Sequence, residues 1–367
     1  MSAAGSQPAG GAAAPAPPGP PLPYAQRPDW ADVTPVHIPE EAVVAIQYTA
    51  EHSDALGYFR AVVRSGELSP RVLALTADMI RFNQADYTAW RVRWRCVQAL
   101  GPEALASELD FTHAVMLENA KNYQLWNHRR LCALQLGAAC ADREDAFTRE
   151  AIAFDEKNYH AWAHRQAVVR VSGRWAAELA FAAELIERDV RNNTAWNQRM
   201  FCLQHMPREG ADDAAWLRRE LEYVAGAIAK APRNEAPWRY LTGLFATLQP
   251  WAGQPRALST FPDVHQICQE ALQECPACAP ALDVMAAYYE GLAALGVARA
   301  QQQLAAAGGA PGAGPVQGAV AGVLHAVAAA NSALEEAGLA DPMRAPYWFH
   351  RMRGLTPLQA QAEALLA

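Results

Sequence analysis

The chain has 367 residues, of which 51% are apolar and 19% charged, with a formal net charge of −7 and an isoelectric point near 5.8. This acidic balance argues against a nucleic-acid backbone or an anionic membrane as the main partner, because either would select a basic face. The seven cysteines are an odd number and lie mostly in segments that we predict to be helical, which indicates reduced thiols. We therefore expect a cytoplasmic protein.

The first 22 residues are rich in Pro, Ala and Gly and predict a disordered tail without the features of a secretory signal. One repeat domain is predicted over residues 23–353, with a flexible low-complexity insertion at 301–318 and a C-terminal tail at 354–367. No apolar run approaches the ~20 residues needed to cross a bilayer, so no membrane span is expected.

A tryptophan motif recurs five times, at intervals of 36, 36, 34 and 42 residues. An Asp or Asn lies four residues before each tryptophan, and an arginine lies three residues after it in every copy except the last, which has Leu241. The motifs lie near 86–94, 122–130, 158–166, 192–200 and 234–241, and their marker residues are Trp90, Trp126, Trp162, Trp196, Trp238, Arg93, Arg129, Arg165 and Arg199.

A period in the thirties with a fixed signature is typical of stacked helical hairpins, and no segment favours a strand. We therefore predict an all-α fold, a solenoid of stacked helical hairpins. The Asx residue is expected to cap each motif helix, the tryptophan to pack, and the arginine to bind a neighbouring carbonyl or carboxylate.

Two sets of motif residues are candidates for function. Lys157 and Tyr159 flank the Asn158 cap at a helix N-terminus, where backbone N–H groups favour an anion such as a phosphate. Lys121 and Tyr123 repeat this pair, and a solvated lysine beside a packed tyrosine is the open alternative. The residue two before each tryptophan varies, which suits either a binding surface or ordinary surface variation: Thr88, Gln124, His160, Thr194 and Ala236.

The segment 265–278 contains four residue types that bind zinc: His265, Cys268, Cys275 and Cys278. Its spacing lacks the turn residues of a zinc knuckle, and Cys268 lies on an apolar helical stripe. We therefore expect no metal site in this chain, and a zinc-dependent enzyme that uses this segment remains a competing hypothesis.

The repeats DYTAWRVR, NYQLWNHRR, NYHAWAHRQ, NNTAWNQR and NEAPW resemble those of protein prenyltransferase alpha subunits. The flanking YAQRPDWADV and DPMRAPYW are similar to the alpha subunit shared by protein farnesyltransferase and geranylgeranyltransferase type I. Rab geranylgeranyltransferase alpha subunits share the repeats but fit the N-terminal segment less well. A tetratricopeptide-like scaffold that binds peptides without catalysis is the other alternative.

The resemblance implies a right-handed, crescent-shaped superhelical solenoid of hairpins that wraps around a beta subunit, and an enzyme only as an obligate heterodimer. The beta subunit would hold zinc, and magnesium is the second expected cofactor. The enzyme would transfer a farnesyl or geranylgeranyl group from its diphosphate to the cysteine of a C-terminal CaaX motif. The implied catalytic residues are Lys157 and Tyr159. Lys157 and Asn192 would bind the isoprenoid diphosphate, and Gln124 and His160 would face the peptide.

Overall fold

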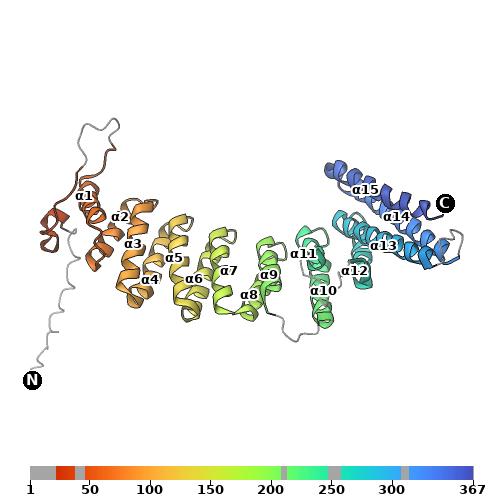
Figure 1. The fold of residues 1–367 in the computed structure, drawn as a ribbon, viewed down its shortest axis with the longest axis horizontal. Coiled ribbons are helices and arrows are strands. Elements are labelled where there is room, and N and C mark those ends of the chain that lie inside the picture. The colour runs from red at the N-terminus through yellow and green to blue at the C-terminus, as the bar shows by residue number, and fades with distance from the viewer. Residues whose placement is uncertain (1–21, 38–45, 208–212, 247–257, 307–313, 367) are drawn as a thin grey trace, which may run out of the picture. The chain divides into compact units, whose positions relative to one another are not determined.

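The computed structural model describes residues 22–37, 46–207, 213–246, 258–306 and 314–366, so nearly all of the predicted N-terminal tail lies outside it. These residues form helices and no strand, which confirms the all-α prediction (Figure 1). The α-helices are α1 (Ala50–Ser65), α2 (Pro70–Phe82), α3 (Tyr87–Leu100), α4 (Pro102–Glu118), α5 (Tyr123–Leu136), α6 (Ala141–Phe154), α7 (Tyr159–Ser172), α8 (Trp175–Arg188), α9 (Asn193–His205), α10 (Asp213–Lys230), α11 (Glu235–Ala246), α12 (Pro262–Glu274), α13 (Ala279–Ala306), α14 (Gly314–Ala340) and α15 (Ala345–Ala364).

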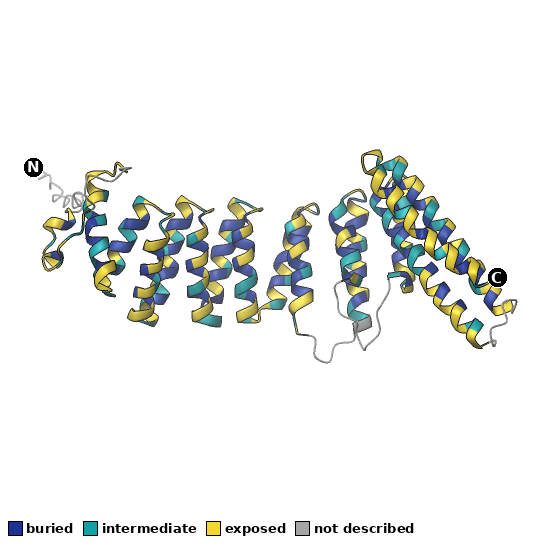
Figure 2. Cartoon of the chain, turned by 45° about the horizontal axis from the view of Figure 1, so that its top comes forward, coloured by how far each residue is buried: buried dark blue, intermediate teal, exposed yellow. Residues whose placement is uncertain are grey.

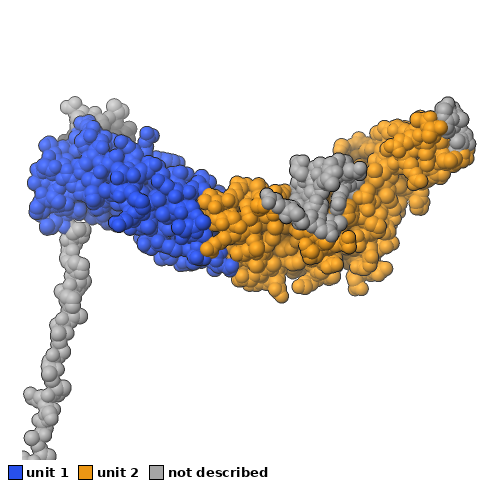
Figure 3. All heavy atoms as spheres, turned by 60° about the horizontal axis from the view of Figure 1, so that its bottom comes forward, with its two compact units in different colours: residues 1–164 blue, residues 165–367 orange. Residues whose placement is uncertain are grey.

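The helices follow one another as hairpins, and each tryptophan motif opens the second helix of a hairpin. We number the repeats by their tryptophans, so that repeat 1 is α2 with α3 and repeat 5 is α10 with α11. The chain divides into two compact units, residues 1–164 and 165–367, which Figure 3 colours separately. Unit 1 holds repeats 1 and 2 with the start of α7, and unit 2 holds repeats 4 and 5 with the C-terminal helices.

Apolar stripes and glycine turns explain why these segments form hairpins. In α4 the stripe of Leu105, Leu109, Thr112 and Met116 is buried, and similar dark stripes mark the other helices in Figure 2. The motif helices α3, α5 and α7 are each followed by a glycine with positive φ, at 87°, 65° and 70° for Gly101, Gly137 and Gly173. Glycine adopts this left-handed conformation without a Cβ clash, so the chain can reverse at once into the next helix.

The C-terminal helices extend further than the sequence predicted. Most of the predicted tail at 354–367 belongs to α15, because Leu355 and Ala362 continue its buried face. The low-complexity segment 301–318 is helical at both ends: α13 continues to Ala306 and α14 begins at Gly314, while 307–313 lie outside the described residues. Alanine, frequent in this segment, has the highest helix propensity, which accounts for the difference from the expected flexible insertion.

Among the described residues one helix, α13, is long and apolar enough by length and composition to cross a membrane. In this structure α13 packs against α12, α14 and α15, and many of its alanines, valines and leucines are buried there. A buried core helix can have the same length and composition, so these two properties of α13 are only weak evidence for a membrane span.

Candidate functional site

Each motif helix begins at an Asx residue that caps it. Asn122 Oδ1 accepts a hydrogen bond from Leu125 N at 2.8 Å, and Asn158 Oδ1 accepts from His160 N and Ala161 N. Asp86 and Asn192 cap α3 and α9 in the same way. Asn234 Oδ1 accepts from Ala236 N at 3.3 Å, so the predicted caps are present in all five repeats.

The tryptophans link neighbouring repeats through a shared carbonyl oxygen. Each indole Nε1 donates to the backbone oxygen six residues earlier, for example Trp126 to Ala120 O at 2.8 Å. The Asx amide of the next repeat donates to the same oxygen, as Asn158 Nδ2 does at 2.9 Å. The same pairing occurs at Gln84 O, from Trp90 and Asn122, and at Val190 O, from Trp196 and Asn234. All five tryptophans are buried, so their structural role is clear.

The motif arginines bind buried glutamates that the sequence reasoning had not identified. Arg129 donates to both carboxylate oxygens of Glu144, at 2.9 and 2.8 Å, and lies over the Phe147 ring. The same arrangement joins Arg93 to Glu108 and Arg199 to Glu220, and Arg165 Nε donates to Glu178 Oε1 at 2.7 Å. A signal existed in the sequence: Glu108 and Glu144 are separated by the same interval as Trp90 and Trp126.

Each of these glutamates also contacts the next motif helix, through the residue two after its tryptophan. His128 Nε2 lies 2.7 Å from Glu108, His164 Nε2 lies 2.6 Å from Glu144, and Gln198 Nε2 donates to Glu178 at 2.7 Å. The Tyr240 hydroxyl donates to Glu220 at 2.6 Å. Burial lowers the pKa of both histidines, which keeps them neutral.

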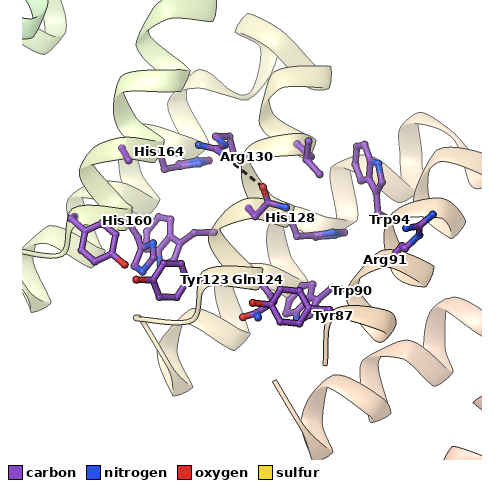
Figure 4. Close-up of a pocket in the computed structure, with 15 residues that line it drawn as sticks. Tyr87, Trp90, Arg91, Trp94, Tyr123, Gln124, His128, Arg130, His160 and His164 are labelled. Atoms are coloured by element: carbon purple, nitrogen blue, oxygen red, sulfur yellow. Dashed lines mark hydrogen bonds between the residues drawn. The ribbon is translucent and has the colours of Figure 1, made fainter. Parts of the chain in front are cut away.

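A groove of about 770 Å³ opens in unit 1 along α3, α5 and α7 (Figure 4). Its walls are aromatic, with Trp94 on one side and Tyr123 and His160 on the other. Arg91 and Arg130 are the charged residues that line it, and no carboxylate does. The whole chain has a net charge of −7, whereas the charged residues of the groove are both arginines. Positive charge among aromatic side chains suits an anionic ligand with an apolar portion.

Three of the predicted site residues line this groove: Tyr159, Gln124 and His160. The sequence reasoning missed Arg91 and Arg130, and it did not assign Tyr87 to a site. A signal for Tyr87 was present, because Tyr87, Tyr123 and Tyr159 all lie three residues before a motif tryptophan.

Tyr123, Tyr159 and His160 form a contact cluster at one end of the groove. The His160 ring lies 4.0 Å from the Tyr159 ring and 4.4 Å from the Tyr123 ring, centroid to centroid. A hydrogen bond with Tyr123 raises the pKa of Tyr159 to about 12, although its side chain is 56% exposed. Burial lowers the pKa of His160. At neutral pH the cluster therefore offers uncharged hydrogen-bonding groups.

Lys157 lies next to this cluster in sequence, but it does not line the groove. Its side chain is exposed, and its backbone N–H donates to Asp155 Oδ1 at 2.9 Å. The Lys121 ammonium lies 3.2 Å from Asp155 Oδ2. The two lysines thus flank one carboxylate, whose pKa is lowered first by the Lys157 backbone hydrogen bond and then by Lys121.

Asn192, predicted to bind the diphosphate, belongs to unit 2, whereas the groove residues belong to unit 1. Its side chain is buried at the start of α9, where Oδ1 accepts from Ala195 N at 3.1 Å. The contact shown is that of a helix cap.

The residues that could have formed a zinc site are engaged elsewhere. His265 Nε2 lies 2.9 Å from the Tyr289 hydroxyl, and Cys278 Sγ donates to Pro232 O at 3.1 Å. Across the part of the chain that the structure describes, no group of three or more His, Cys, Asp or Glu residues could hold a metal ion. This geometry gives no support to the zinc-enzyme hypothesis.

A family model described as "Protein prenyltransferase alpha subunit repeat" matches residues 105–136, 141–171 and 175–206. A Pisum sativum protein named protein farnesyltransferase/geranylgeranyltransferase type-1 subunit alpha is 46% identical over 228 residues, which cover 61% of this chain and 67% of the relative. The Arabidopsis thaliana protein of the same name is 44% identical over 241 residues, covering 65% and 73%.

A solved structure shares the fold. It is the Candida albicans protein geranylgeranyltransferase-I complexed with GGPP, and one of its chains matches with a TM-score of 0.65 at 24% identity. The match covers 90% of this chain and 99% of that chain.

Proposed function

The chain belongs to the protein prenyltransferase alpha subunit family, and from this premise we propose that it is the alpha subunit of a heterodimeric farnesyltransferase and geranylgeranyltransferase type I. The names of the pea and Arabidopsis relatives support this assignment. The partner is a beta subunit, and the heterodimer acts on an isoprenoid diphosphate and a protein that ends in a CaaX motif. A cytoplasmic location stays our expectation from the odd number of cysteines in the sequence.

The reaction forms a thioether between the CaaX cysteine and C1 of the isoprenoid, and diphosphate leaves. In this proposal zinc would be held by the beta subunit and would activate the cysteine thiol, and magnesium would offset charge on the diphosphate. The alpha chain binds and orients the substrates from one side. Its donors act where negative charge develops on the leaving diphosphate, and such preorganised electrostatic stabilisation accelerates the reaction.

The observation that carries the proposal is the groove of unit 1, with aromatic walls, two arginines and no lining carboxylate. Gln124 and His160 lie on it and present neutral polar groups to the end of a peptide. The Tyr159 hydroxyl stays protonated at neutral pH and can donate a hydrogen bond to an anion.

The leaving diphosphate requires cations, and Lys157 is the first candidate. Its side chain is exposed at the start of α7, beside Tyr159. Lys121, on the other side of Asp155, is placed equivalently before Tyr123. We assign the diphosphate to both lysines. An additional contact from Asn192 stays a prediction from the resemblance.

Charge reversal in the groove tests the proposal in the heterodimer, made by co-expression with a beta subunit. Arg130→Glu and Arg91→Glu place a carboxylate on the groove, and we expect at least a tenfold loss of kcat/KM for prenyl transfer to a CaaX peptide. Arg95→Glu is the matched control, because Arg95 is exposed on α3 but does not line the groove. Equal activity of all three variants would contradict a substrate role for the groove, and assembly without transfer by the wild type would favour a peptide-binding scaffold.

A further inference from the structure

The α12–α13 hairpin carries a sixth copy of the turn that precedes each motif helix. In repeats 1 to 4 an Asx residue stands at both ends of that turn, as Asp155 and Asn158 do in repeat 3. Here Cys275 ends α12, a two-residue turn follows, and Cys278 immediately precedes α13. Leu282 N donates to Cys278 O at 3.1 Å, as Trp162 N donates to Asn158 O. The sequence therefore contains a degenerate repeat with cysteines at the Asx positions.

Cys278 also reproduces both hydrogen bonds of the Asx side chain that it replaces. Its sulfur accepts from Ala281 N, three residues on, which is the capping bond. Its thiol donates to Pro232 O at 3.1 Å. Pro232 O is the oxygen that also accepts from Trp238 Nε1 at 2.7 Å. A thiol thus links the sixth hairpin to repeat 5, where asparagine side chains link the earlier repeats.

Cys275 and Cys278 stand at the two ends of this turn. Residues at the two ends of a four-residue turn have Cα atoms within about 7 Å, which overlaps the 4.4–6.8 Å range of disulfides. Burial raises the pKa of the Cys278 thiol, and the nearby Cys275 sulfur raises it further. Cys278 is fully buried, whereas Cys275 is partly exposed. Arg233 Nε lies 3.2 Å from Cys275 Sγ, so the more exposed of the two sulfurs has a cation beside it.

We propose that Cys275 and Cys278 are a redox-active pair that forms a disulfide across this turn when the chain meets a small-molecule disulfide. The Cys275 thiolate attacks one sulfur of the oxidant, forms a mixed disulfide and expels the first small thiol. The Cys278 thiolate then attacks the Cys275 sulfur and expels the second. The protein dithiol is oxidised, the oxidant is reduced to two thiols, and these take up the two protons that the cysteines release.

Oxidation removes the thiol proton that Cys278 donates to Pro232 O, so the link between repeat 5 and the sixth hairpin loses a hydrogen bond. Trp238 Nε1 still donates to that oxygen, so the carbonyl remains satisfied. The modification is therefore expected to loosen one connection within unit 2 and to leave the fold intact.

The test exposes the full chain, copurified with its beta subunit, to oxidised glutathione, blocks the remaining thiols and maps disulfides by peptide mass spectrometry. We expect a peptide that contains Cys275 and Cys278 to lose two hydrogen atoms, and dithiothreitol to reverse the change. In Cys278→Ser the reaction stops at a glutathione adduct on Cys275. Cys268→Ala, in the same helix α12, is the matched control and forms the disulfide normally.

Three results would overturn the proposal. Both thiols could remain fully alkylated at glutathione ratios that oxidise a reference dithiol. Cys268 could be linked to Cys278 instead, since Cys268 is buried nearby. The glutathione adduct on Cys275 could also accumulate in the wild type without resolving to the disulfide.

Discussion

The Nε2 atom of His164 lies 2.6 Å from Oε2 of Glu144, and both side chains are almost fully buried, at 1% and 0% exposure. Arg129 from the preceding motif helix holds the same carboxylate. A single buried glutamate therefore joins two successive motif helices, and the same arrangement recurs at Glu108, Glu178 and Glu220. Such a buried charge must be paired to be tolerated, which makes these contacts sensitive to substitution and to pH.

Replacing His164 with glutamine should reduce the acid sensitivity of the fold. In the unfolded chain His164 takes up a proton near pH 6.5, whereas burial lowers its pKa in the folded chain. Below that pH the unfolded state binds more protons, so the free energy of unfolding falls as the pH falls, by at most ~1.4 kcal/mol per pH unit for this group. Glutamine at the equivalent position, Gln198, already binds Glu178, so His164→Gln keeps the neutral contact.

Urea unfolding at about pH 7.5 and about pH 5.5 measures this effect. We expect His164→Gln to match the wild type at the higher pH and to lose about 1 kcal/mol less on acidification. His128 and the glutamates remain in the variant, so part of the pH dependence persists. An unchanged difference between the two pH values would show that His164 is not a buried neutral group.

Removing Arg129 should destabilise unit 1 strongly. Arg129→Ala leaves Glu144 buried and without its bidentate partner, which typically costs about 3–5 kcal/mol. The adjacent exposed Arg130 is the control, and Arg130→Ala should change the free energy of unfolding by about 0.5 kcal/mol or less. Guanidinium unfolding compares the two variants, and equal midpoints would refute a structural role for the Arg129 pair.

Asn122 tests the bond between repeats separately from the helix cap. Asn122→Ala removes both the cap on α5 and the bond to Gln84 O, for an expected loss of about 1–3 kcal/mol. Asn122→Ser restores a capping oxygen and should recover about 1 kcal/mol of it. If serine recovers the full wild-type stability in thermal unfolding, the bond to Gln84 O contributes nothing.

The tryptophan period alone predicted the helical hairpins, because packing and capping repeat with the sequence. It did not by itself identify Glu108 or Glu144 as partners of the arginines, although they recur at the tryptophan interval, because polar residues within a striped helix look like part of its solvated face. Their burial depends on the next repeat, which supplies His128 and His164. The groove was predicted in part: Tyr159, Gln124 and His160 share positions that a motif defines, whereas Arg91 and Arg130 follow no repeat rule.

The C-terminal boundary was harder to predict for a related reason. An alanine-rich sequence resembles a low-complexity, unstructured segment. Its small side chains nevertheless allow α13 and α14 to pack closely, and Val323 approaches Gly296. A helix pair of this kind carries no motif residue that periodicity could detect.

The lysines beside Asp155 should affect the chemical step more than peptide binding. Lys157→Ala and Lys121→Ala each remove a cation that meets charge on the leaving diphosphate, and we expect kcat to fall about 10- to 100-fold while KM for the peptide changes little. Single-turnover transfer in the reconstituted heterodimer separates chemistry from product release. Unchanged single-turnover rates in both variants would exclude the proposed anion role.

The most direct test of the account titrates this chain into a purified beta subunit and measures farnesyl and geranylgeranyl transfer to a CaaX peptide. We expect no transfer by either chain alone, and activity that rises with added alpha chain until the two are equimolar. Saturation at one alpha per beta would establish that this chain completes the enzyme. Transfer by the isolated chain, or no transfer at any ratio with a beta subunit that assembles with it, would contradict the account.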